Sequence, residues 1–94
     1  MEKKIESRLR DGVKKLGGKA FKWVSPGNSG VADRLVLMPG NKSYIVELKK
    51  GGSKVLRPEQ KIFKKFVESL GFRYYLLSSS EEVDSFLTAI KTSI

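Results

Sequence analysis

The chain has 94 residues, of which 39% are hydrophobic and 31% charged, a composition typical of a folded soluble protein rather than a disordered one. Nineteen Lys and Arg against ten Asp and Glu give a net charge of +9, which favours a polyanionic partner such as nucleic acid or an acidic membrane surface. Cysteine and histidine are absent, which excludes disulfides, thiol nucleophiles, imidazole bases and Cys/His zinc sites, so any metal must be held by oxygen.

The first half of the chain predicts a helix followed by three strands. Apolar residues recur at spacings of three and four up to Leu16, and two glycines then end the helix. Three β-rich segments follow, and the short sequence around Gly40 and Asn41 predicts a hairpin between the second and third. The expected elements are a helix over residues 2–16 and strands over residues 19–24, 33–38 and 43–49.

The second half predicts a helix, a strand and a last helix. Pro58 suits the first turn of a helix whose apolar stripe stops at Gly71, and residues 73–77 read as a strand. Ser79 and Glu82 have the spacing of a capping box that opens the last helix. Because a full helix precedes the fourth strand, we expect that strand to pair in parallel, which makes a mixed four-stranded sheet.

A carboxylate pair is the candidate functional feature. Glu47 and Lys49 lie two residues apart and share one face of their strand, and Asp33 begins the neighbouring strand. Two carboxylates at this position are suitable ligands for magnesium. Taken alone, a Glu-x-Lys sequence is more typical of an exposed strand end than of a site, and an aspartate after a glycine loop often simply begins an element.

The carboxylates share a face only in one class of hairpin register. Side chains alternate between the faces of a strand, so paired positions must sum to an even number, as in 33 with 47. A loop of two or four residues centred on Gly40 and Asn41 gives an odd sum and points Asp33 to the other face. The hypothesis therefore predicts a three-residue loop, or a bulge near the site.

An ordered set of motifs resembles a known family. Residues 30–37 read Gly-Val-Ala-Asp-Arg-Leu-Val-Leu, residues 44–50 read Tyr-Ile-Val-Glu-Leu-Lys-Lys, and Gly51-Gly52 and Arg57-Pro58-Glu59-Gln60 follow. Together they resemble the virus-type replication-repair nuclease (VRR-NUC) domain of the wider PD-(D/E)xK nuclease group, over nearly the whole chain. Ala32 departs from the pattern, since the group's name leads one to expect proline there; proline would only shape the backbone.

The resemblance implies an α/β fold with a restriction-endonuclease-like αβββαβ(α) core, and it implies roles for the motif residues. Asp33 and Glu47 would ligate a divalent cation, Mg²⁺ or Mn²⁺, and the backbone carbonyl of Leu48 could add a neutral ligand. Lys49 would be the catalytic lysine that orients water or stabilises phosphate charge, and Gln60 would be an additional polar residue of the active site.

Glu6 resembles the acidic residue in the family's first helix, which would make it a fifth catalytic residue. The alternative for Glu6 is a salt-bridge partner on a basic helix, and Glu2 lies one turn earlier.

Basic residues follow the candidate site and continue onto the next helix. The functional interpretation is contact with DNA phosphates, and the alternative is a solvated helix face. No base-reading motif is evident, so recognition of DNA shape or branching is favoured over recognition of sequence. The candidate DNA-binding residues are Lys50, Lys54, Arg57, Lys61 and Lys64.

The resemblance also implies a homodimer, since two sites acting on opposite strands would suit a four-way (Holliday) junction. Aromatic side chains that remained exposed could supply the interface, and core packing is the alternative for each of them. The candidates are Trp23, Tyr44, Phe72, Tyr74 and Tyr75.

Three functions follow as hypotheses for a single domain over residues 1–94. The first is a metal-dependent, structure-selective DNA endonuclease, encoded by a phage or prophage. The second is a catalytically silent nucleic-acid-binding module with the same fold, and the third is a basic protein-interaction domain. No run approaches the roughly 18 apolar residues of a membrane span, and residues 1–10 lack the apolar core of a signal peptide. We therefore expect no membrane partner and a cytoplasmic location in a bacterial host or phage-infected cell.

Overall fold

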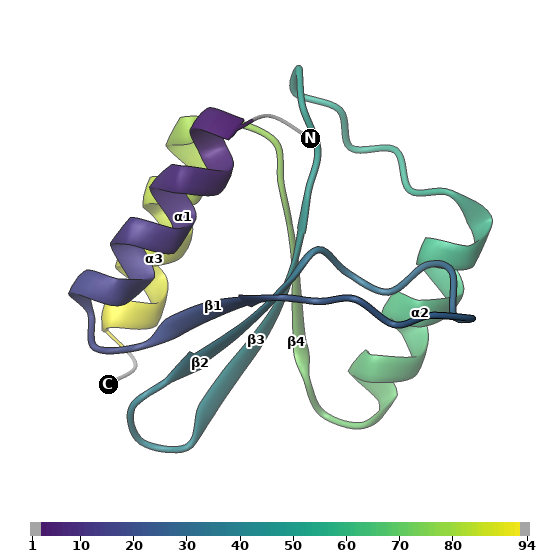
Figure 1. Ribbon diagram of the computed structural model, residues 1–94, viewed down its shortest axis with the longest axis horizontal. Helices are drawn as coiled ribbons and strands as arrows, with labels where there is room; N and C mark the ends of the chain where they lie inside the picture. The colour runs from purple at the N-terminus through teal and green to yellow at the C-terminus, as the bar shows by residue number, and fades with distance from the viewer. Residues whose placement is uncertain (1–2, 93–94) are drawn as a thin grey trace.

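The computed structural model describes residues 3–92 and confirms the predicted order of helices and strands (Figure 1). The first strand ends at Lys22, two residues before the predicted end, and the third ends at Leu48, so Lys49 directly follows it. Glu2, the predicted first helical residue, lies outside the described residues. The elements are α1 (Lys3–Lys15), β1 (Lys19–Lys22), β2 (Arg34–Met38), β3 (Lys42–Leu48), α2 (Pro58–Ser69), β4 (Arg73–Leu77) and α3 (Ser80–Lys91).

The four strands form one mixed sheet in the order β1-β2-β3-β4. The β1–β2 and β2–β3 pairs are antiparallel, and the β3–β4 pair is parallel. The sheet is therefore mixed, as predicted, and α2 supplies the crossover that its parallel pair requires.

The hairpin between β2 and β3 has the even register that the site hypothesis requires. Met38 pairs with Lys42 and Arg34 pairs with Val46, so paired positions sum to an even number. Three residues remain for the loop, and the last of them, Asn41, has φ of 61°, the left-handed conformation that a three-residue hairpin loop commonly contains. One more residue of the same register places Asp33 beside Glu47, without a bulge.

Helices cover both faces of the sheet, and they divide the core into two parts. Figure 1 shows α1 and α3 together on one side of the sheet and α2 on the other. Tyr44, Val46 and Leu48 of β3 face α1 and α3, in a core completed by apolar residues of both helices. Ile45 faces α2 and packs with Val67 in a second, smaller cluster. The alternation predicted for β3 is therefore confirmed.

One predicted interface aromatic belongs instead to the core. Tyr44 is 2% exposed, and its ring centroid lies 5.8 Å from that of Phe86 and 6.1 Å from that of Tyr75. Its burial follows from β3 being an inner strand with a helical layer over this face. Tyr44 is thus not available to a partner, whereas Phe72 remains 40% exposed.

The last helix begins where it was predicted, with one difference in its cap. The Ser79 hydroxyl accepts a hydrogen bond from the Glu82 N–H at 3.1 Å, which is the expected half of a capping box. The Glu82 carboxylate accepts from the N–H of Ser78 at 2.7 Å and from its hydroxyl at 2.9 Å, not from Ser79. None of the described helices is long and apolar enough to cross a membrane.

The glycine loop before β2 packs directly on the start of α2. Gly30 has φ of +90°, and a Cβ built there would lie 2.5 Å from the Glu59 carbonyl oxygen and 3.2 Å from the Gln60 nitrogen. Gly27 in the same loop has φ of +81°, but a Cβ there would have no atom within 4 Å. Gly30 thus allows the approach that brings the segment before Asp33 against the residue before Gln60.

We expect Gly30→Ala to destabilise the protein much more than Gly27→Ala. Both substitutions impose a left-handed backbone on alanine, which costs roughly 1–2 kcal/mol. Only Gly30→Ala adds a backbone clash, so its total cost should be about 3 kcal/mol or more. Urea unfolding followed by circular dichroism would measure both changes in the free energy of unfolding. Equal losses in the two variants would contradict the close packing of this loop on α2.

Candidate active site

Asp33 and Glu47 form the centre of the candidate site at one end of the hairpin. The Leu48 N–H donates a hydrogen bond to Oδ2 of Asp33 at 2.8 Å, which ties the carboxylate at the start of β2 to the end of β3. Glu47 is 4% exposed, and its Oε2 accepts from Nε2 of Gln60 at 3.1 Å. Its other oxygen, Oε1, is buried and has no hydrogen-bond partner among the described residues.

Gln60 connects Lys49, the candidate catalytic lysine, to Glu47. Nζ of Lys49 donates to Oε1 of Gln60 at 3.1 Å and lies 3.9 Å from Oε2 of Glu47. The same Gln60 oxygen accepts from the Arg57 N–H at 2.8 Å, which also completes the first turn of α2. The structure therefore brings Asp33, Glu47, Lys49 and Gln60 together, as the sequence motifs predicted.

The two carboxylates give the site a negative charge that Lys49 balances only in part. Burial and the neighbouring Asp33 carboxylate raise the pKa of Glu47 to about 7, and Lys49 only partly opposes them. Two carboxylates this close, one of them buried, resist being charged together unless a cation neutralises them.

The donor set fits a divalent cation with oxygen ligands. Asp33 and Glu47 supply hard anionic oxygens, and the unpartnered Oε1 of Glu47 is a buried acceptor available for a ligand. Within residues 3–92 there is no group of three or more His, Cys, Asp or Glu side chains that could hold a metal. Two carboxylates with a backbone carbonyl match the small number of protein ligands that Mg²⁺ usually takes.

Glu6 lies against Arg34 rather than against the carboxylate pair. The two side chains form an ion pair, and Arg34 is 7% exposed on the sheet face that meets α1. Glu6 thus has the salt-bridge contact that was the alternative for it, with a residue adjacent to Asp33 in the chain. The sequence motifs gave Arg34 no role; the available signal was its position two residues before Val36, on the same buried face of β2.

The basic candidates differ in their surroundings. Lys54 donates to the Leu76 carbonyl at 3.1 Å and ion-pairs with Glu82. Hydrogen bonds from Lys54 and the Ser78 N–H hold the pKa of the Glu82 carboxyl at about 2. Lys54 therefore fastens the loop after β3 to the junction of β4 and α3.

An open, basic groove runs between that loop and α2. It has a volume of about 440 Å³, and four of its six lining residues are lysines. Lys50 and Arg57 are exposed nearby, with Arg57 Nε 3.3 Å from a Glu59 carboxylate oxygen. The groove is lined by Lys54, Leu56, Lys61, Lys64, Lys65 and Glu68.

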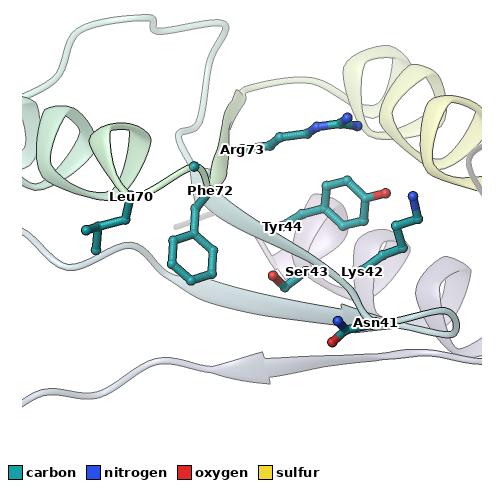
Figure 2. Close-up of a pocket in the computed structure, with 8 residues that line it drawn as sticks. Asn41, Lys42, Ser43, Tyr44, Leu70, Phe72 and Arg73 are labelled. Atoms are coloured by element: carbon teal, nitrogen blue, oxygen red, sulfur yellow. The ribbon is translucent and has the colours of Figure 1, made fainter.

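A smaller polar pocket lies at the opposite end of β3. It has a volume of about 230 Å³ between the β2–β3 turn and the start of β4. Figure 2 shows Arg73, Tyr44 and Lys42 on one side of it and Phe72 and Leu70 on the other. It contains no carboxylate, so it offers none of the cation ligands found at the Asp33–Glu47 end.

Two proteins with known sequences or structures are similar to this chain. A protein of Acyrthosiphon pisum secondary endosymbiont phage 1, described as "Putative nuclease p44", is 40% identical over 93 residues, which is 95% of this chain and 94% of that protein. A solved structure of a VRR_NUC domain superposes with a TM-score of 0.87 at 25% identity, covering 93% of this chain and 94% of that one. No family model matches the chain.

The raised pKa of Glu47 predicts how the metal-free protein responds to pH. A carboxyl whose folded pKa exceeds the ordinary value of 4.5 contributes stability that is complete below pH 4.5 and lost as pH rises through about 7. Thermal unfolding in EDTA should therefore show wild type losing stability between pH 5 and pH 8 relative to Glu47→Gln, by at most about 3 kcal/mol. Parallel pH profiles for the two proteins would contradict the charge assignment.

Proposed function

We propose that this chain, which belongs to the virus-type replication-repair nuclease (VRR-NUC) family, is a metal-dependent, structure-selective DNA endonuclease that hydrolyses phosphodiester bonds. The observation that carries the proposal is the pairing of Asp33 and Glu47, with Lys49 held beside them through Gln60. Without histidine, a bound cation would have to activate the water and stabilise the phosphate charge, and two carboxylates beside a lysine suit that chemistry.

Asp33, Glu47 and the Leu48 carbonyl would hold Mg²⁺ or Mn²⁺. When bound, such a cation supplies Lewis-acid stabilisation of phosphate charge and lowers the pKa of the attacking water. Lys49 places a positive charge where negative charge develops on the phosphate. Gln60 fixes the ammonium group of Lys49 and one oxygen of Glu47, so both are oriented before substrate arrives.

The proposed substrate is branched or duplex DNA, such as a four-way junction. The net charge of +9 and the lysine groove beside the site support phosphate contact, which gives affinity without reading sequence. Given the phage relative, we place the protein in the cytoplasm of a bacterial host or phage-infected cell.

A homodimer is the proposed assembly, and an apolar face supports it. Six large apolar side chains are each at least 40% exposed on the side of the molecule that carries α2. Four of them line a groove of about 350 Å³, and none of the residues that line it is charged. This apolar face consists of Phe21, Leu37, Ile62, Phe66, Leu70 and Phe72.

The size and shape of the apolar face suit a second copy of the chain. With about 200 Å² for a fully exposed large side chain, its six residues present roughly 600 Å². A standard interface buries about 800 Å² per partner, with an apolar centre and a polar rim. Phe66 and Leu70 of α2 line the groove, and Ile62 lies one turn earlier on the same helix. One apolar surface is therefore available to pair with the same surface of a second copy about a two-fold axis.

Cleavage should depend on the cation and on the site residues. We expect wild type to cut labelled four-way junctions with Mg²⁺ and to stop with EDTA, and Asp33→Asn and Lys49→Met to lower the rate at least about 100-fold. Lys42→Met, at the far end of β3, serves as the matched control and should retain the wild-type rate.

Cleavage that survives EDTA or either site substitution would overturn the proposed mechanism. Junction binding without cleavage under both Mg²⁺ and Mn²⁺ would favour the silent nucleic-acid-binding module instead. A linear duplex in parallel tests selectivity: equal cutting of the two substrates would refute structure selection.

The dimer prediction has its own test. Light scattering on wild type at micromolar concentration should give twice the chain mass of 10.5 kDa, and Phe66→Lys should give the single mass because it buries a charge in the interface. Val55→Lys is the control, since Val55 is 74% exposed on the loop after β3, outside the apolar face. A monomeric wild type, or a dimer unaffected by Phe66→Lys, would contradict this assignment.

A further inference from the structure

Tyr74 of β4 lies on the same sheet face as the carboxylate site. In the parallel pair, Tyr74 lies beside Ile45 and Leu76 lies beside Glu47. Tyr74 is therefore the diagonal neighbour of Glu47, with Cα atoms about 8 Å apart from the strand spacing and the rise per residue. A tyrosine side chain is long enough to span most of that distance.

The Tyr74 hydroxyl is an orphan in a buried, acidic environment. Its oxygen is buried and has no hydrogen-bond partner among the described residues. A tyrosine hydroxyl, with an ordinary pKa of about 10, is protonated at neutral pH and can act as a donor. Nζ of Lys64 lies 5.7 Å above the centre of the ring, which confines the side chain from the α2 side.

One carboxylate oxygen of Glu47 lacks a hydrogen-bond donor among residues 3–92. Its Oε2 accepts from Gln60, while its Oε1 is buried and unpartnered. Buried donors and acceptors in folded proteins are nearly always paired. Within the described part of the chain, the Tyr74 hydroxyl is an unpaired donor and Oε1 of Glu47 is an unpaired acceptor on the same face of the sheet, so each is a suitable partner for the other. Both groups are buried on the face of the sheet that meets α2, and the charge of Glu47 acts on Tyr74.

We propose that Tyr74 is a positioning residue of the hydrolytic site, whose hydroxyl donates to Oε1 of Glu47 and so fixes the orientation of that carboxylate. The inference rests on the proposed function, because it assigns Tyr74 to the same cation-binding carboxylate. Gln60 and Tyr74 then hold the two oxygens of Glu47 from α2 and from β4, and each oxygen keeps a second lone pair for the cation. Outer residues that orient a metal ligand typically contribute 10- to 100-fold to metal affinity or activity.

The alternative is that Tyr74 is only a core aromatic. Removing an unsatisfied buried hydroxyl from such a residue is neutral or stabilising and leaves the chemistry unchanged. Tyr75 provides a matched control on the adjacent position of β4, because its ring faces the opposite core and packs 4.8 Å from Phe86.

The test compares Tyr74→Phe and Tyr75→Phe with wild type in the full chain. Calorimetric titration with Mn²⁺ should show affinity falling about 10-fold in Tyr74→Phe only. Cleavage of a four-way junction should show kcat falling by a similar factor with KM for DNA unchanged, and thermal unfolding should show that the variant remains folded. Tyr75→Phe should match wild type in both assays.

Several results would overturn the proposal. They are a Tyr74→Phe variant within twofold of wild type in Mn²⁺ affinity and kcat, equal losses in both variants, or a raised KM with unchanged kcat, which would mark a DNA contact. A wild type that neither binds Mn²⁺ nor cleaves DNA would remove the proposed function itself, and Tyr74 with it. An active wild type beside an unaffected Tyr74→Phe would remove the role of Tyr74 alone.

Discussion

The register of the β2–β3 hairpin is the constraint on which the site depends. Three loop residues after Met38 set the pairing, and that pairing places Asp33 beside Glu47 on the face covered by α2. A shift of one residue would turn Asp33 toward α1 and α3 and separate the two carboxylates by the thickness of the sheet. The hydrogen bond from the Leu48 N–H to Asp33 holds this register at the point where the strands end.

The two faces of the sheet have different roles. The face under α1 and α3 carries most of the buried apolar residues, including the aromatic group around Tyr44 and Phe86. The face under α2 has only a small buried cluster, and it carries both the carboxylate site and the apolar face. Stability therefore comes mainly from one face, which leaves the other free to hold buried charge and exposed apolar surface, both of which cost stability in an isolated chain.

Much of this arrangement was predictable because it depends on local spacing. Periodicity and turn residues predicted the order of the elements, and the motif residues Asp33, Glu47, Lys49 and Gln60 are brought together as expected. Contacts between distant segments were not predictable. The Glu6–Arg34 pair, the Glu82 contact with Lys54 and the place of Tyr74 beside the site all depend on how strands and helices pack, which single-sequence periodicity does not contain.

The central claim is that Asp33 and Glu47 bind the cation, and crystallography tests it most directly. Crystals grown with Mn²⁺ and measured at an X-ray energy where manganese scatters anomalously would locate the ion directly. We expect an anomalous peak coordinated by Asp33 and Glu47 that is lost in Asp33→Asn crystals. A peak on Glu6 or in the pocket beside Lys42 and Arg73, or no peak at the carboxylate pair at millimolar Mn²⁺, would contradict it.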